Sequence, residues 1–151
     1  MAAATVAVVT YAPDAVLEAG PTADYVAYQL SSSKARSQPM GQQEIAIIVG
    51  TGPGLSASLT RLCAREGMQV VVAARDTGKL ADLVRDAGAH PIACDVVDRR
   101  QVESLFEEVD KRWGSPHLVV FNAGERYRAP IEAIDPERFD TALRVTALGG
   151  L

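Results

Sequence analysis

A glycine-rich turn between an expected strand and an expected helix constrains this 151-residue chain more than any other feature. The run Ile45–Val49 has the length and β-branched content of a buried parallel strand. The turn Gly50–Gly54 follows, and apolar residues then recur at helical spacing, at Leu55, Leu59 and Leu62. Glycines let a backbone turn sharply and approach a ligand, and the N–H groups at a helix start attract phosphate. The segment therefore predicts a nucleotide-binding turn.

Strands and helices alternate along the chain after this turn. Further strands are expected at Gln69–Ala74, His90–Cys94 and Leu118–Phe121. The expected helices lie around Lys79–Ala87, closed by Gly88, then from a cap at Asp98 to Trp113, and finally from a cap at Asp135 towards Leu148. Strands separated by helices of this length form right-handed crossovers. We therefore predict an α/β fold, a Rossmann-type doubly wound parallel sheet in three α/β/α layers, with strand order 3-2-1-4.

The composition favours a small-molecule ligand. The net charge of −4 comes from 15 basic and 19 acidic residues without a basic stripe, so no nucleic-acid partner is expected. No apolar run reaches the length of a membrane span, so no membrane partner is expected either. Cys63 and Cys94 lie in apolar segments and are interpreted as buried, reduced thiols of a cytoplasmic protein. His90 and His117 stand apart from other ligand types, so no metal site is predicted.

Residues 1–39 differ from the rest, and we expect an N-terminal extension or linker there, poorly ordered, ahead of a partial NAD(P)-binding domain at residues 40–151. Ala2–Tyr11 is apolar, but no Lys or Arg precedes it, which argues against a secretory signal. Asp14 and Glu18 argue against a mitochondrial presequence. Ser31–Pro39 has the composition of a linker. A native start at Met40 and a functional leader are both compatible with this pattern.

Four segments carry a further pattern. They are the loop Gly50-x-x-x-Gly54-x-Ser56, then Cys94-Asp95-Val96, then Asn122-Ala123-Gly124, and last Phe139-Asp140 with Gly149. In this order and spacing over residues 44–151 they resemble the short-chain dehydrogenase/reductase family. The resemblance implies an NAD(P)-dependent oxidoreductase that transfers hydride between NADP(H) and a carbonyl or alcohol substrate, in a family that is usually homo-oligomeric. The implied cofactor-binding residues are Gly50, Thr51, Gly52, Gly54, Leu55, Ser56, Arg75, Asp95, Val96, Asn122, Ala123 and Gly124.

The end of the second expected strand bears on the choice of cofactor. NAD-selective members of the family place an acidic residue there to bind the ribose 2′-OH. Here Ala73 and Ala74 are followed by Arg75, whose guanidinium can bind a 2′-phosphate. We expect Asp76, one position later, to point away. NADP(H) is therefore favoured over NAD(H), and the alternative is that Arg75 is a solvated charge at the end of a strand.

Several positions depart from the family pattern. Ser56 replaces the third glycine of the loop, although a small hydroxyl could still face a phosphate. Thr146 stands where the family helix carries its active-site Asn. The sequence given ends at Leu151, before the strand with the catalytic Ser and the helix with Tyr-x-x-x-Lys, so no catalytic residue is assigned and binding without turnover is expected. Tyr127 has no Lys four residues on and is interpreted as an ordinary loop residue.

The resemblance to the short-chain dehydrogenase/reductase family also implies an incomplete sheet. We expect the strand Leu118–Phe121 to have an unpaired edge, because the family strand that would lie beside it is not in the sequence. We also expect the last helix to expose the apolar residues Leu143, Val145 and Leu148.

Two other function classes share features with this sequence. Gly50-Thr-Gly52-Pro-Gly54 also fits the G-x-G-x-G of S-adenosylmethionine-dependent methyltransferases. Those proteins usually carry acidic residues where this chain has Ile48 and Ala73 or Ala74. A non-catalytic dinucleotide-binding or regulatory protein remains the main alternative. A P-loop is excluded because no Gly-Lys-Ser/Thr follows the turn.

Overall fold

The computed structural model describes residues 5–8 and 43–150. They form one parallel sheet of five strands in the order β1-β5-β2-β3-β4. The strands are β1 (Thr5–Val8), β2 (Ile45–Val49), β3 (Gln69–Ala74), β4 (His90–Ala93) and β5 (Leu118–Phe121). The four strands expected from the sequence occur in the predicted order, because β4-β3-β2-β5 is the same succession read from the opposite direction.

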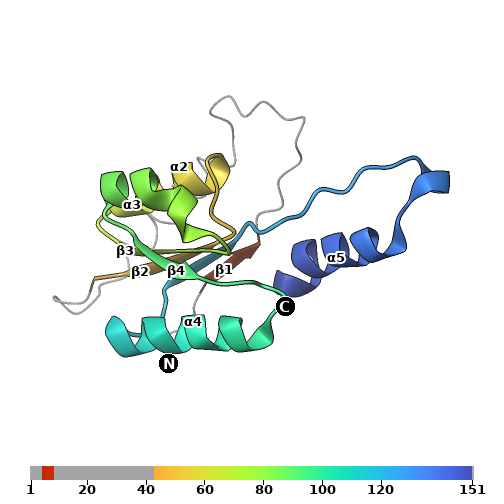
Figure 1. Cartoon of the computed structure of the whole chain (residues 1–151). Helices are drawn as coiled ribbons and strands as arrows, with labels where there is room; N and C mark the ends of the chain where they lie inside the picture. Colours follow the sequence, from red (N-terminus) through yellow and green to blue (C-terminus); the bar gives the residue numbers. More distant parts are fainter. Residues whose placement is uncertain (1–4, 9–42, 151) are drawn as a thin grey trace. The chain divides into compact units, whose positions relative to one another are not determined.

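Helices cover both faces of this sheet, as Figure 1 shows for α2 and α3 on one face and α4 on the other. The α-helices are α2 (Leu55–Arg65), α3 (Ala81–Ala87), α4 (Arg99–Arg112) and α5 (Pro136–Thr146). Short 3₁₀ turns are η1 (Thr77–Leu80), η2 (Ile131–Ala133) and η3 (Leu148–Gly150). The predicted α/β class and three-layer, Rossmann-type architecture are therefore confirmed.

The core is built around the central strand β2. All five of its residues are buried, as expected for a parallel strand covered on both faces. On the α4 side, Ile47 packs in one cluster with Leu105 and Val109 of that helix. Trp113, just after α4, is partly buried and packs against the same cluster.

Strand β1 corrects two expectations. Thr5–Val8 pairs in parallel with Leu118–Phe121, so β5 has a neighbour on both sides and its edge is not unpaired. The expectation of a poorly ordered extension at residues 1–39 does not hold for residues 5–8, which form a strand of the sheet. The physical reason is that an open strand edge can pair with any short extended segment, since the bonds are made by the backbone. The linker-like segment 31–39 and Met40 lie outside the described residues.

Smaller differences concern the ends of elements. The helix expected around residues 79–87 begins with the 3₁₀ turn η1, and α3 then ends as predicted at Gly88, which is left-handed with φ of 63°. The last helix stops at Thr146 and continues as η3. Leu143 and Leu148 are exposed as expected, whereas Val145 is buried, with 6% of its surface accessible. Val145 differs because it is the one buried residue of α5.

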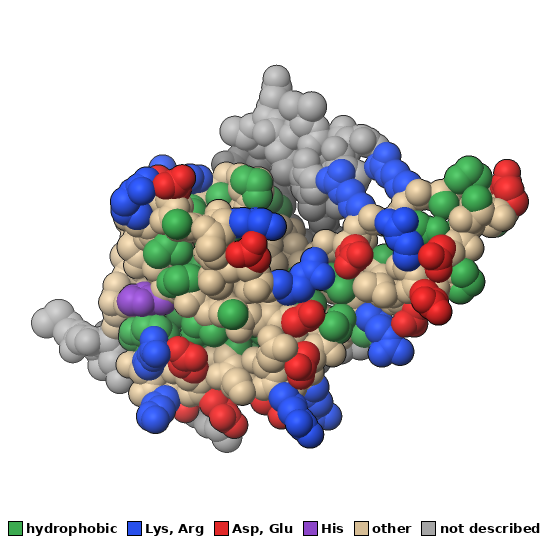
Figure 2. Space-filling view, in the orientation of Figure 1, with side chains coloured by type: hydrophobic (Ala, Val, Ile, Leu, Met, Phe, Trp, Pro, Cys, Tyr) green, Lys and Arg blue, Asp and Glu red, His purple; other side chains and the backbone are tan. Residues whose placement is uncertain are grey.

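The surface carries charges of both signs. On the face drawn in Figure 2, Lys and Arg side chains alternate with Asp and Glu side chains. Within residues 5–8 and 43–150, no helix is both long enough and apolar enough to cross a bilayer.

Candidate functional site

The carboxyl ends of the parallel strands bring the predicted motifs to one edge of the sheet. The N–H groups of Gly50 and Thr51, after β2, donate to the carbonyl oxygen of Ala73 in β3 at 2.9 and 3.1 Å. The N–H of Asn122, after β5, donates to the carbonyl oxygen of Val49 at 2.8 Å. The N–H of Cys94, after β4, donates to Ala74. This edge is where ligands bind in open parallel sheets.

Gly50 is required by the protein itself. Its φ of 80° lies in the left-handed region that side chains rarely adopt. A Cβ at this position would also overlap the backbone N and Cα of Ala123 and lie 2.7 Å from the carbonyl carbon of Asn122. The glycine therefore lets the turn after β2 pack directly on the turn after β5.

Gly52 and Gly54 differ from Gly50, because neither the backbone conformation nor the packing of the described residues requires a glycine at these positions. Neither has a positive φ. Apart from each glycine and its two chain neighbours, no atom of residues 5–8 or 43–150 would lie within 4 Å of a Cβ built on either glycine. The described residues thus leave open space along this part of the loop, where a ligand can approach the backbone closely.

The start of α2 differs from the starts of the other described α-helices, since α3, which also lacks a capping side chain, holds Asp82 in its first turn. Asp98 and Asp135 cap α4 and α5, and Asp76 caps η1, each by accepting backbone N–H bonds. The bonds from Gln101 and the backbone lower the pKa of Asp98. At α2 the cap is Gly54, and in the described part of the chain no side chain caps it and its first turn holds no acidic residue. Its N-terminal N–H groups and dipole thus face no protein carboxylate in that turn.

Ser56 joins the glycine loop to the Asn122-Ala123-Gly124 motif. Ser56 is buried, with 1% of its surface accessible to solvent. The hydroxyl donates to the carbonyl oxygen of Gly50 at 3.1 Å and accepts from Nδ2 of Asn122 at 2.7 Å. The serine that replaces the family's third glycine therefore bridges two loops in this structure, and its hydroxyl hydrogen is directed at Gly50 rather than outwards.

Thr51 and Leu55 complete the loop. Thr51 is buried, and its hydroxyl donates to the carbonyl oxygen of Ile48 at 2.8 Å. Leu55 is the first residue of α2 and is half-buried. The polar side chain of Thr51 is thus satisfied internally, and what the loop can offer a ligand is backbone.

The loop after β4 is held from two sides. An oxygen of the Asp95 carboxylate accepts from the N–H of Val97 at 3.2 Å, and the Asp95 N–H donates to Oε1 of Gln101 at 2.9 Å. Val96 lies against η3, where a Cβ on Gly149 would come within 3.0 Å of Cγ2 of Val96. Gly149, which the sequence assigned only to the family's helix pattern, thus allows close packing at the site.

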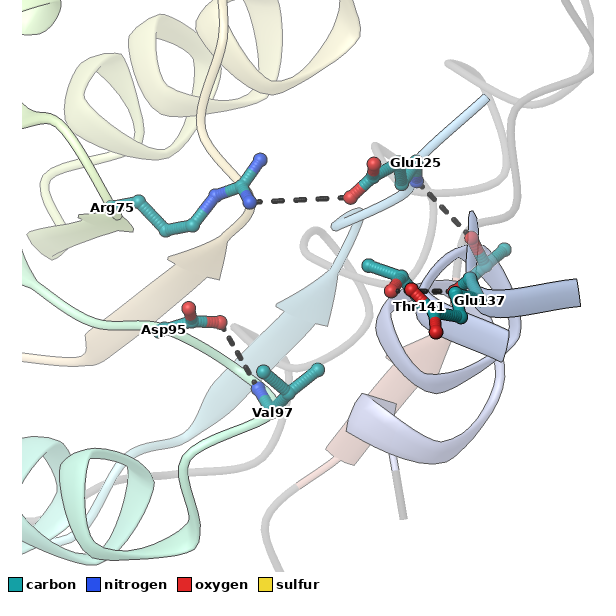
Figure 3. Close-up of polar contacts among 7 residues, drawn as sticks. Arg75, Asp95, Val97, Glu125, Glu137 and Thr141 are labelled. Atoms are coloured by element: carbon teal, nitrogen blue, oxygen red, sulfur yellow. Dashed lines mark hydrogen bonds and ion pairs between the residues drawn. The ribbon is translucent and has the colours of Figure 1, made fainter. Parts of the chain in front are cut away.

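Two charged residues face each other above the sheet edge, as Figure 3 shows. Nη1 of Arg75, after β3, lies 4.0 Å from Oε2 of Glu125, which follows Gly124. The neighbouring Asp76 is occupied elsewhere: its carboxylate accepts from the N–H of Gly78 and pairs with Lys79 at 3.2 Å. The Lys79 contact is the main cause of the lowered pKa of Asp76. Sequence reasoning did not single out Glu125, and no local pattern marks its nearness to Arg75.

Thr146 contacts the same turn. Its hydroxyl oxygen accepts the N–H of Glu125 at 3.2 Å. The residue that stands in the place of the family's active-site Asn therefore links α5 to the turn after β5.

The remaining candidate residues have structural roles. The hydroxyl of Tyr127 accepts from the N–H of Asp135 at 2.6 Å, and the guanidinium of Arg138 lies over its ring. Nδ1 of His117 accepts from the N–H of Ile45 at 3.1 Å, and the ring of His90 packs on Trp113. Among the described residues, no three His, Cys, Asp or Glu side chains gather as a metal site.

The two cysteines are buried and free, as the sequence predicted. Burial raises the pKa of the Cys63 thiol to about 11 and also raises that of Cys94. Neither thiol is therefore activated as a nucleophile, since the thiolate is the reactive form.

Comparison with known proteins agrees with this geometry. The family model described as short chain dehydrogenase matches residues 44–150. An uncharacterised oxidoreductase of Bacillus subtilis, YxjF, is 30% identical over 111 residues, which is 69% of this chain and 42% of that protein. The trihydroxynaphthalene reductase PfmaI of Pestalotiopsis fici is 25% identical, with 70% of this chain and 40% of that protein covered. The chain thus spans about half the length of the curated relatives it matches or less.

Solved structures give the same result. An actinorhodin polyketide ketoreductase variant with NADPH is 27% identical, with a TM-score of 0.67 over 71% of this chain and 43% of that one. An alcohol dehydrogenase from the archaeon Thermococcus sibiricus, complexed with 5-hydroxy-NADP, is 28% identical, with a TM-score of 0.64 over 72% and 48%.

The fold and the turns at the carboxyl ends of the strands define a Rossmann-type α/β domain. More particularly, the chain belongs to the short-chain dehydrogenase/reductase family. Membership decides against the methyltransferase alternative.

Proposed function

We propose that residues 44–150 bind NADP(H) in a short-chain dehydrogenase/reductase that transfers hydride to or from a small carbonyl or alcohol compound. The nicotinamide supplies the hydride chemistry when it is bound. The twelve cofactor-binding residues expected from the sequence are proposed to hold it. Most of them offer backbone groups, whereas Arg75 offers a charged side chain.

The observation that carries this proposal is the contrast among the glycines of the turn. Gly50 is needed for packing against Ala123, but Gly52 and Gly54 meet open space in the described structure. Beside them, α2 begins without a capping side chain. A phosphate placed there would receive backbone N–H bonds and a favourable helix dipole, so the residues present fit a dinucleotide.

Preference for NADP(H) is supported by the end of β3. No acidic side chain stands at Ala73 or Ala74, and Asp76 is engaged with Gly78 and Lys79. Arg75 is 65% exposed and available to a 2′-phosphate. Two similar solved proteins carry NADPH and 5-hydroxy-NADP, which agrees with this preference.

Titration of NADPH and NADH tests the proposal. The wild type is expected to bind NADPH more tightly, and Arg75→Ala is expected to lose about 1.5–3 kcal/mol of NADPH affinity with little change for NADH. Arg61→Ala, an exposed arginine on α2, controls for net charge. An unchanged preference in Arg75→Ala would remove the role assigned to Arg75.

The alternative of a non-catalytic dinucleotide-binding protein depends on whether the chain carries a catalytic Tyr-x-x-x-Lys motif. No Tyr in the 151 residues is followed four positions later by Lys. We therefore propose cofactor binding without turnover for the chain as given. Oxidation of NADPH in the presence of small ketones, dependent on Arg75, would instead show that these residues are sufficient for reduction.

A further inference from the structure

Arg75 does not face solvent alone. In Figure 3 its guanidinium points towards the carboxylate of Glu125, and the closest atoms, Nη1 and Oε2, are 4.0 Å apart. The two side chains come from the ends of different strands, β3 and β5. Both are partly exposed, at 65% and 38% of their side-chain surfaces, so a ligand can reach the space between them.

The backbone of Glu125 is held in place on both sides. It follows directly on the turn 122–124, which packs on Gly50. Its own N–H donates to the Thr146 hydroxyl oxygen at 3.2 Å, which joins it to α5. The carboxylate is therefore carried on a fixed support rather than on a free loop.

Building on the proposed function, we propose that Glu125 is a specificity-determining residue that weakens the preference of the site for a 2′-phosphate. A 2′-phosphate bound by Arg75 has to replace the Glu125 carboxylate as the guanidinium's partner. It then lies close to that carboxylate, and two negative charges repel. A ribose 2′-hydroxyl carries no charge and meets neither cost.

The size of the effect follows from exposure. Exposed ion pairs contribute little because water and salt screen them, so removing the carboxylate should raise affinity for the 2′-phosphate about two- to fivefold. The gain should be largest at low salt and should shrink as the ionic strength rises. It should also require Arg75, because without the guanidinium there is no partner to release.

Two adenosine compounds isolate this effect from the rest of the cofactor. Adenosine 2′,5′-bisphosphate and adenosine 5′-monophosphate differ only by the 2′-phosphate. Their affinities are measured by calorimetry on the full 151-residue chain as wild type, Glu125→Gln, Arg75→Ala and the double variant. Glu132→Gln, which removes an exposed carboxylate from η2, is the matched control for net charge. Melting curves verify that Glu125→Gln is folded.

The expected result is a two- to fivefold tighter binding of the bisphosphate by Glu125→Gln, with the monophosphate unchanged. The gain should be absent in the Arg75→Ala background and in Glu132→Gln. If Arg75→Ala weakens bisphosphate binding while Glu125→Gln matches the wild type, Glu125 has no such role and the proposed function stands. An equal gain for both compounds would also overturn the inference. Failure of the wild type to bind either compound or NADPH would overturn the proposed function and this inference with it.

Discussion

The turn after β2, together with the first half of α2, makes its hydrogen bonds in different surroundings from the segment after β5. Thr51 of the turn and Ser56 and Thr60 of α2 are buried and donate to backbone carbonyl oxygens inside the protein. After β5, residues 131–140 are all exposed, and the bonds are local, such as the Asp135 cap and the Arg144–Asp140 pair of α5. Unfolding of the turn should therefore be coupled to unfolding of the whole sheet, whereas α5 should unfold largely independently of the sheet.

The largest effect is expected at Gly50. Gly50→Ala places a Cβ against the Ala123 backbone and demands an unfavourable φ, so the turns after β2 and β5 cannot keep their contact. We expect a loss of about 3 kcal/mol or more, enough to unfold a marginally stable domain. Circular dichroism melting curves measure it.

Gly52→Ala is the matched comparison, because its Cβ would meet no described atom within 4 Å. Its melting temperature should stay within a few degrees of the wild type, while NADPH affinity falls. Equal destabilisation by both substitutions would show that the two glycines do not differ as argued.

These contrasts indicate how far a sequence can be interpreted alone. Strands β2, β3 and β5 match the expected ranges to the residue, because runs such as Gln69–Ala74 are apolar and bounded by turn residues. The motifs predicted to share a site do meet at one sheet edge, since their positions after parallel strands dictate it.

Other features depend on contacts between distant residues. Strand β1 was not predicted because Thr5–Val8 is too short for its residue pattern to indicate a strand. Its pairing depends on the available edge of β5. The Ser56–Asn122 bond joins residues 66 positions apart, and the Arg75–Glu125 pair joins two strand ends. No local period or spacing encodes such pairs.

A smaller effect is expected at Ser56. Ser56→Ala removes the donor to Gly50 and leaves Nδ2 of the half-buried Asn122 without its acceptor at 2.7 Å. We expect a cost of about 1–3 kcal/mol, the usual range for losing a hydrogen-bond partner in a protein interior. Urea unfolding measures this difference.

Ser58→Ala serves as the control, because Ser58 is exposed on the same helix. It should change the free energy of unfolding by no more than about 0.5 kcal/mol. If Ser56→Ala were equally mild, the hydroxyl bridge would have no part in joining the two loops.

The smallest global effect is expected from removing the cap of α5. Asp135 accepts the N–H groups of Glu137 and Arg138 at 3.0 and 3.4 Å, so Asp135→Ala should cost that helix about 1 kcal/mol. Only Val145 of α5 is buried, so the loss should appear as faster amide hydrogen exchange within residues 136–146. The melting temperature of the domain should barely change.

Asp98→Ala removes the corresponding cap of α4 and allows the two helices, α4 and α5, to be compared directly. That helix buries Leu105 and Val109 in the core beneath β2, so loosening its first turn is coupled to the whole sheet. We expect Asp98→Ala to lower the melting temperature of the domain. A similar decrease from Asp135→Ala would mean that α5 unfolds together with the sheet, and that the segment after β5 belongs to the same cooperative unit as the turn.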